Sequence, residues 1–118
     1  DRYMRALEPV AEQLDLQLPH VPAHATSAHH MQYVLLPTSE IRNRVLDTMR
    51  SNGVQATFHY VPLHSSEAGR RFSDSDHDCP VTDDVSGRLL RLPYYNDLAV
   101  SDQDRVIDVF IAAARAAG

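Results

Sequence analysis

The sequence predicts a small two-layer α+β domain in which about three short strands are covered by amphipathic helices. Three observations support this fold class. The chain has 118 residues, of which 43% are hydrophobic, and this suits one domain with a modest core. Between residues 29 and 60, a strand pattern, a helix pattern and a second strand pattern follow one another. A long apolar stripe at helical spacing then closes the chain.

The first element is a helix over residues 1–7, because Tyr3 and Leu7 are four positions apart and share a helical face. Pro9 lacks an amide N–H, so we expect a break just before it and one or two further turns after it. Residues 17–28 contain two prolines, two histidines and small polar side chains, a composition typical of a connection.

The first strand covers residues 29–37, where apolar side chains alternate onto both faces and favour a central position in a sheet. The helix that follows begins at Thr38 or Ser39, either of which can cap it with a side-chain oxygen. Its apolar stripe consists of Ile41, Val45, Leu46 and Met49. Gly53 ends this helix, because glycine adopts the left-handed conformation of a helix C-terminus without strain.

The second strand covers residues 55–60. It stops at Pro62, which cannot donate a hydrogen bond and disfavours the helical region for the preceding residue. A strand that opens into a loop is a usual place for side chains that bind a ligand. His59, Tyr60 and His64 lie at this strand end and are the candidate binding residues. His59 and Tyr60 point to opposite faces unless the strand bends, and the alternative is that they are structural residues.

The remaining elements complete the alternation of helices and strands. Residues 65–80 are polar and loop-like, with a short helical turn at residues 66–71. A helix over residues 81–88, capped by Thr82, leads into a third strand at residues 89–93. The last helix starts at Ser101 and ends at Gly118, and its buried face consists of Val106, Ile107, Phe110, Ile111 and Ala114.

The charge balance narrows the classes of partner. Sixteen acidic residues outnumber eleven basic ones, and the net charge of −5 argues against nucleic acid and against an anionic membrane surface. No apolar run approaches the ~20 residues of a membrane span, and no secretory signal opens the chain. Cys79 is the single cysteine, so an internal disulfide is excluded. We therefore expect a cytoplasmic protein with neither nucleic acid nor membrane as a partner.

The histidines, the cysteine and the arginines are further side chains that can bind ligands or carry out chemistry. The chain has seven histidines, but pairs such as His77 with Cys79 do not match a structural zinc site, and no metal is expected. Arg70 and Arg71 can bind a phosphate or form a solvated pair on a loop. Every one of the eleven basic residues is arginine, so chemistry that needs a lysine cannot be anchored by this chain.

Two runs of residues, taken together in order, resemble a known family. Residues 59–69 read His-Tyr-Val-Pro-Leu-His-Ser-Ser-Glu-Ala-Gly, and residues 86–93 read Ser-Gly-Arg-Leu-Leu-Arg-Leu-Pro. They resemble the C-terminal part of the DegT/DnrJ/EryC1/StrS sugar aminotransferases, and the likeness extends over residues 3–111. Residues 28–33 look like that family's first small-domain strand. Within the family, the likeness is to the transaminases that convert TDP-4-keto-6-deoxyglucose to TDP-4-amino-4,6-dideoxygalactose.

The resemblance implies a domain arrangement. Members of the family are homodimeric fold type I pyridoxal-phosphate enzymes with active sites between subunits. A large N-terminal domain holds the cofactor and the Schiff-base lysine, and a small C-terminal domain closes over the sugar nucleotide. Residues 1–118 would form that small domain, with residues 1–17 as the end of the helix that links it to a large domain outside this chain.

The resemblance also implies a function. The intact protein would transfer an amino group from an amino-acid donor, expected to be glutamate, to a 4-keto-6-deoxy sugar nucleotide such as a TDP-sugar. His59, Tyr60 and His64 would bind that substrate, and no catalytic, cofactor-binding or metal-binding residue is assigned here. The chain alone is expected to be inactive and to hold no pyridoxal phosphate. The alternative is a stand-alone ferredoxin-like module that binds or senses a small molecule.

Overall fold

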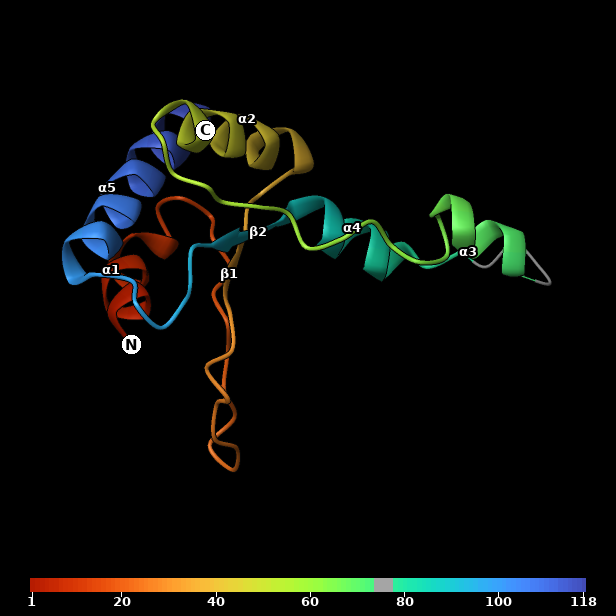
Figure 1. Ribbon diagram of the computed structural model, residues 1–118, viewed down its shortest axis with the longest axis horizontal. Coiled ribbons are helices and arrows are strands. Elements are labelled where there is room, and N and C mark those ends of the chain that lie inside the picture. The colour runs from red at the N-terminus through yellow and green to blue at the C-terminus, as the bar shows by residue number, and fades with distance from the viewer. Residues whose placement is uncertain (74–77) are drawn as a thin grey trace.

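The computed structural model describes residues 1–73 and 78–118, and within them it has five helices and one two-stranded sheet (Figure 1). The elements in chain order are α1 (Arg2–Ala11), β1 (Gln32–Leu35), α2 (Ser39–Ser51), α3 (Glu67–Phe72), α4 (Pro80–Arg88), β2 (Leu89–Leu92) and α5 (Val100–Ala117). The predicted α+β class is therefore confirmed, although the number of strands is smaller than expected.

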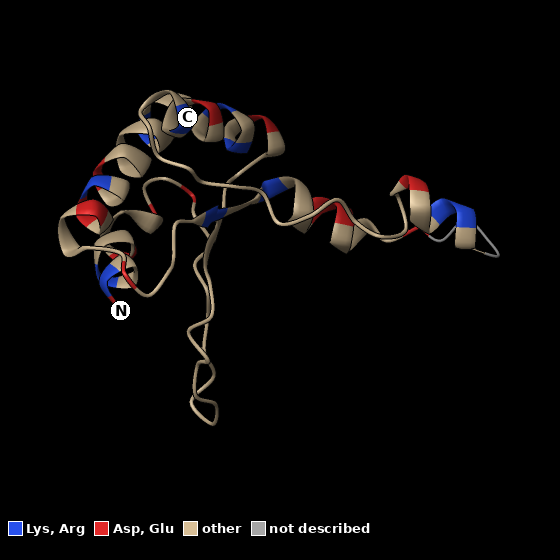
Figure 2. Ribbon diagram, viewed as in Figure 1, with Lys and Arg blue, Asp and Glu red and all other residues tan. Residues whose placement is uncertain are grey.

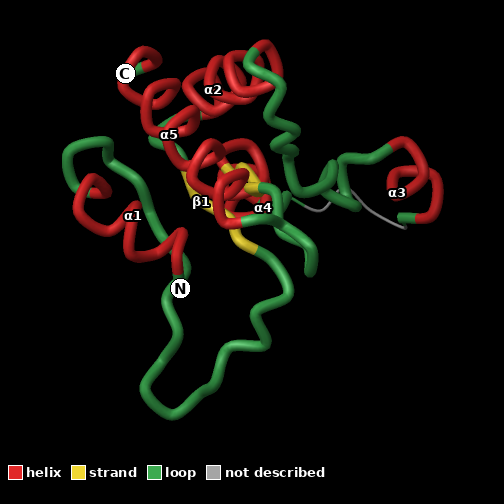
Figure 3. The backbone as a smooth tube through the Cα atoms, turned by 60° about the vertical axis from the view of Figure 1, so that its left-hand side comes forward, coloured by secondary structure: helices red, strands yellow, loops and turns green. Residues whose placement is uncertain are grey.

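The elements form a body with two projections. In the body, α5 packs against α1 and α2, and α2 also contacts α4 and β2. One projection is the connection between α1 and β1, and the other, called the arm below, consists of residues 58–73 together with α4 (Figures 1 and 3). The radius of gyration is 15.6 Å. A compact chain of this length would have a radius of about 13–14 Å, so the projections account for the difference.

The sheet is narrow. Strand β1 pairs antiparallel with β2, with Tyr33 opposite Arg91. On the outer side of each strand, one residue of a neighbouring segment makes an isolated bridge: Gln17 pairs with Leu35, and Thr57 pairs with Arg91. The sheet order is thus residue 17, β1, β2 and residue 57, and only the central pair is a regular ladder.

The predicted strand over residues 55–60 is wrong, because only Thr57 pairs with β2. Tyr60 has φ = 61°, which lies in the left-handed region and is incompatible with an extended strand. The chain leaves the sheet after Thr57 and runs beside α4 (Figure 1). The strand predicted over residues 29–37 is also shorter, since His29 has φ = 46° and pairing begins only at Gln32.

The helices agree more closely with the sequence. Thr38 caps α2 by accepting a hydrogen bond from the Ile41 amide at 3.2 Å, as predicted. Gly53 follows α2 with φ = 72°, also as predicted. The expected break before Pro9 is wrong: α1 runs through it to Ala11, and the apolar face is packed on both sides of it, with Leu7 buried before Pro9 and Ala11 against the core after it.

Smaller shifts occur at three other helices. The short turn predicted at residues 66–71 is α3, and Ser66 caps it. Helix α4 begins at Pro80 with Cys79 at its cap position, so Thr82 does not start it. Helix α5 begins at Val100, one residue before the expected Ser101. None of the described helices combines the length and the apolar character that crossing a bilayer requires.

A single apolar core lies between the sheet and the helices. Its fully enclosed side chains come from α1, both strands, the residue after β1, α2 and α5: Tyr3, Leu7, Val34, Leu36, Val45, Met49, Leu90 and Phe110. The predicted buried face of α5 is confirmed except for Ile111, which is only partly buried against the core. The arm contributes little to this core, since Leu63 and Phe72 are 76% and 88% exposed.

Candidate functional site

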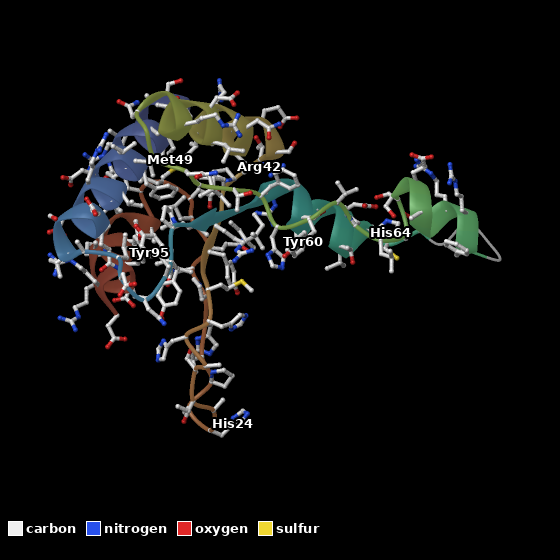
Figure 4. The ribbon with its side chains drawn as sticks, viewed as in Figure 1. His24, Arg42, Met49, Tyr60, His64 and Tyr95 are labelled. Carbon is white, nitrogen blue, oxygen red and sulfur yellow. The ribbon has the colours of Figure 1, made fainter. Side chains whose placement is uncertain are left out.

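The three candidate residues all lie on the arm, in the irregular run between Thr57 and α3. Figure 4 shows Tyr60 and His64 along this run, which passes beside α4. The run has no regular secondary structure of its own. Its conformation therefore depends on side-chain contacts with α2 and α4 and on local turn geometry. These contacts differ for the three residues.

His59 and Tyr60 contact each other. Their ring centroids are 4.6 Å apart and the ring planes are inclined by 55°. The two side chains therefore do not alternate onto opposite faces: the chain bends, the case that the sequence left open, because the positive φ of Tyr60 turns the backbone at this residue. An aromatic residue held in the left-handed region costs about 1–2 kcal/mol, and Tyr60 is nevertheless 70% exposed. Strain of this kind at an exposed side chain is typical of a functional site.

One ring nitrogen of His59 has an unusual environment. Its Nδ1 atom is buried and has no hydrogen-bond partner in the described part of the chain. Most buried polar atoms in folded proteins have a partner, because leaving one unpaired destabilises the fold by about 1–3 kcal/mol. The imidazole of His59 thus has an unused donor or acceptor beside an exposed phenol.

His64 is held differently. Its Nε2 atom lies 3.0 Å from Oδ1 of Asp83 in α4, and only 20% of its side chain is exposed. The turn around it is closed by Ser66, whose hydroxyl donates to the Leu63 carbonyl at 2.8 Å and accepts from the Gly69 amide at 2.9 Å. The structure therefore brings His59 and Tyr60 together and pairs His64 with a carboxylate of α4.

Arg42 is a residue near these candidates that the sequence reasoning missed. It lies on α2, and its guanidinium carbon is 5.9 Å from the centroid of the Phe58 ring. Its Nε atom is buried without a hydrogen-bond partner in the described residues, and burial lowers the pKa of the guanidinium. A signal was present: Arg42 stands three and four positions before the buried Val45 and Leu46, so it lies beside the apolar stripe of α2.

Arg42 and Tyr60 both line a hollow of about 430 Å³ between α2 and the arm. The complete lining consists of Arg42, Asn43, Leu46, Phe58, Tyr60, Val61, Pro62, Ser86 and Gly87. Figure 4 shows Arg42 at the end of α2 that faces the run carrying Tyr60. A hollow of this size, mostly apolar with a few polar groups, suits a small organic ligand.

The base of the arm is fastened to the body by an arginine. Arg88 donates from Nε and Nη2 to the two carboxylate oxygens of Asp84, at 3.0 and 2.8 Å, and from Nη1 to the Leu36 carbonyl at 3.1 Å. These bonds lower the pKa of Asp84. Figure 2 shows the acidic residues of α4 and the basic residue at its end. Arg88 therefore joins the end of α4 to the residue that follows β1.

No group of three or more metal-ligating side chains occurs within residues 1–73 and 78–118. His77 lies outside the described residues, so the pair that it forms with Cys79 in the sequence is not tested. This chain offers no anchoring site for pyridoxal phosphate, the cofactor that the predicted family implies. The chain contains no lysine, and no side chain amine is present to hold that cofactor covalently.

The fold defines the class of protein, because solved structures of similar fold are aminotransferases. A DegT DnrJ EryC1 StrS aminotransferase from Brucella abortus superposes with a TM-score of 0.74 at 28% identity, covering 94% of this chain and 28% of that one. The aminotransferase TlmJ from Streptoalloteichus hindustanus has a TM-score of 0.75 at 26% identity, covering 96% and 32%. NtdA from Bacillus subtilis, solved with bound PMP, has a TM-score of 0.82 at 19% identity, covering 98% and 26%, and shows the fold alone.

The chain belongs to the DegT/DnrJ/EryC1/StrS aminotransferase family, which matches residues 1–111. A curated relative, the dTDP-4-dehydro-2,3,6-trideoxy-D-glucose 4-aminotransferase of Saccharopolyspora spinosa, is 30% identical over 92 residues. That alignment covers 78% of this chain and 23% of the relative. The chain thus spans about a quarter of the length of this relative and up to a third of the solved structures named above.

Proposed function

We propose that residues 1–118 form the small C-terminal domain of a pyridoxal-phosphate-dependent nucleotide-sugar aminotransferase, with residues 1–17 ending the helix that links it to a large domain. The intact enzyme would move an amino group to a 4-keto-6-deoxy sugar nucleotide, with a TDP-sugar as substrate and glutamate as donor. The family match over residues 1–111 is the observation that carries this proposal. A ferredoxin-like module without enzymatic context is the alternative, and the family match favours the aminotransferase.

In this proposal the arm is the substrate side of the domain. His59 would use its imidazole, and the exposed Tyr60 its phenol hydroxyl, to form hydrogen bonds with the sugar or the diphosphate. His64 would contribute from the same run, oriented by its bond to Asp83. None of the three residues is proposed to transfer a proton during amino transfer.

The cofactor and the assembly lie outside this chain. Pyridoxal phosphate, when bound, would supply the electron-withdrawing ring for amino transfer, and we place its anchoring lysine in the large domain. This chain alone would be inactive for that reason. We also propose that the intact enzyme is a homodimer. Exposed apolar side chains of the arm, such as Leu63 and Phe72, are consistent with a larger assembly that covers them.

The substitution His59→Ala in the intact protein tests the substrate role. Losing one hydrogen bond to a charged substrate group costs about 1.5–3 kcal/mol, so kcat/KM for the sugar nucleotide should fall roughly tenfold to a hundredfold. The melting temperature and the cofactor absorbance should not change, because His59 lies outside the core. His24→Ala removes an imidazole from the tip of the other projection (Figure 4) and serves as the matched control.

A structural role for His59 gives a different pattern. The melting temperature would fall, and kcat/KM per folded enzyme would stay normal. That result would refute the substrate role while leaving the assignment as an aminotransferase intact. If the intact protein transfers no amino group to any keto sugar nucleotide, the proposed function itself is wrong.

A further inference from the structure

Arg42 is a partly buried cation that has no anionic partner in the described part of the chain. The other two arginines of α2 are satisfied: Arg44 donates to the Ala117 carbonyl, and Arg50 pairs with Asp47 at 3.4 Å. Arg42 makes neither kind of contact, and its Nε is buried and unpaired. A buried donor on a charged group without a partner destabilises a folded protein. The sequence therefore retains an unfavourable group at this position of the fold.

The surroundings hold the guanidinium in place without neutralising it. The face of the Phe58 ring lies 5.9 Å from the guanidinium carbon, a distance at which a cation is attracted to an aromatic ring. The hollow beside it is lined by apolar side chains and by three further polar residues, Asn43, Tyr60 and Ser86. All three carry hydrogen-bonding groups, and none carries a negative charge.

The acidic residues near Arg42 line a second, neighbouring hollow. Gly87 lines both this second hollow and the hollow of Arg42. Glu40, Asp83 and Asp84 line the neighbouring hollow together with Arg88, and none of the three acidic residues lines the hollow of Arg42. Asp84 is already paired with Arg88, and Asp83 with His64. The two hollows therefore differ in sign, and the hollow of Arg42 contains a single cation with nothing to oppose it.

We propose that this hollow binds an oxyanion of a small organic ligand, with Arg42 donating directly to it and Phe58 orienting the guanidinium. A guanidinium presents two parallel N–H donors that match the two oxygens of a phosphate or a carboxylate. Asn43, Tyr60 and Ser86 supply the further hydrogen bonds. Identifying the oxyanion as the diphosphate of the sugar nucleotide or the carboxylate of the amino donor rests on the proposed function.

The test measures binding to the intact protein by calorimetry and by the shift in melting temperature. The probes are inorganic pyrophosphate, thymidine 5′-diphosphate and L-glutamate. The variants are Arg42→Gln, Arg42→Lys and the control Arg50→Gln, which removes the same charge from an exposed position on the same helix. A ligand that binds only the folded state raises the melting temperature, so the shift is a readout that needs no catalysis.

We expect at least one probe to stabilise the wild type and the Arg50→Gln variant. In Arg42→Gln the Kd for that probe should rise at least about tenfold, the usual effect of losing one charge-assisted hydrogen bond. Arg42→Lys should also weaken binding, because it keeps the charge and loses the planar pair of donors. Binding of pyrophosphate and thymidine diphosphate identifies the phosphate, and binding of glutamate identifies the carboxylate.

Three results would overturn the proposal. The first is that no probe binds the wild type. The second is that Arg42→Gln and Arg42→Lys bind every probe as tightly as Arg50→Gln does, and the third is that both Arg42 variants have a lower melting temperature but an unchanged affinity. The last result would assign Arg42 to a carboxylate of the protein itself. If sugar-nucleotide amination proceeds with unchanged kinetics in Arg42→Gln, this inference fails and the proposed function stands. If binding of a probe depends on Arg42 but the intact protein aminates no sugar nucleotide, the oxyanion site stands and the proposed function fails.

Discussion

Gly69 stands where the arm has no room for a side chain. A Cβ atom at this position would lie 1.7 Å from the carbonyl oxygen of Leu63 and 2.7 Å from its carbonyl carbon. Both atoms belong to the backbone, so they cannot move away by a change of rotamer. The same carbonyl accepts a hydrogen bond from the Ser66 hydroxyl, and Ser66 in turn caps α3. We therefore predict that Gly69→Ala displaces the turn that carries His64.

The expected loss can be worked from these contacts. Overpacking costs about 1–3 kcal/mol, and loss of the Ser66 cap costs about 1 kcal/mol more. The greater helix propensity of alanine returns about 0.5–1 kcal/mol. The net loss is about 1–3 kcal/mol, confined to the turn and α3, because the arm contributes little to the core. The bond between His64 and Asp83, now 3.0 Å, should be lost with the turn.

Amide hydrogen exchange followed by NMR measures this local loss directly. Exchange of the Ser66, Gly69 and Arg70 amides should accelerate between roughly fivefold and a hundredfold in Gly69→Ala. Gly87→Ala is the matched control, since a Cβ there would meet only the Ser39 Cβ at an ordinary 3.6 Å. That variant should leave α4 unchanged or slightly stabilised. If the two variants exchange alike in the arm, the packing argument is wrong.

Two further predictions concern the body of the domain. Thr38→Ala removes the cap of α2 and should lower the free energy of unfolding by about 1 kcal/mol in chemical denaturation, whereas an unchanged midpoint would show that the bond to the Ile41 amide contributes nothing. Burial and, to a smaller extent, the neighbouring Tyr95 together raise the pKa of Tyr3 to about 12, and the Tyr3 hydroxyl donates to the Pro93 carbonyl at 2.8 Å. Because the folded-state pKa lies above the unfolded value of about 10, the neutral phenol stabilises the fold fully below pH 10, and this contribution is lost as pH rises through about 12. The free energy of unfolding, measured between about pH 10 and pH 12, should therefore depend more steeply on pH in the wild type than in Tyr3→Phe. Equal slopes would contradict the raised pKa of Tyr3.

Features that depend on neighbours in the sequence could be predicted well. The cap at Thr38, the apolar stripe of α2 and most of the buried face of α5 follow from side chains within one or two turns of each other. The family resemblance also rested on local runs, residues 59–69 and 86–93, and the family match over residues 1–111 confirms it. Periodicity and local motifs carry this information because helix faces and caps are set by spacing along the chain.

Other features could not be predicted in this way. The run around Tyr60 has the composition of a strand, but a strand also needs a partner edge, and pairing with β2 stops after Thr57. Likewise, Pro9 signals a helix end by its chemistry, yet α1 runs through it to Ala11, which packs against the core. In both places tertiary contacts override the local preference of the chain.

The sequence by itself determined the α+β class, the helix faces, the absence of a lysine and the run that carries His59, Tyr60 and His64. Only the tertiary structure decided what those residues contact. The approach of Arg42 to Phe58 and of His64 to Asp83 joins positions 16 and 19 residues apart on separate elements. No local pattern encodes such distances, because they depend on how residues 58–73 pack against α2 and α4. The unpaired nitrogens of Arg42 and His59 are consequences of that packing, since a polar atom becomes buried only when distant segments cover it.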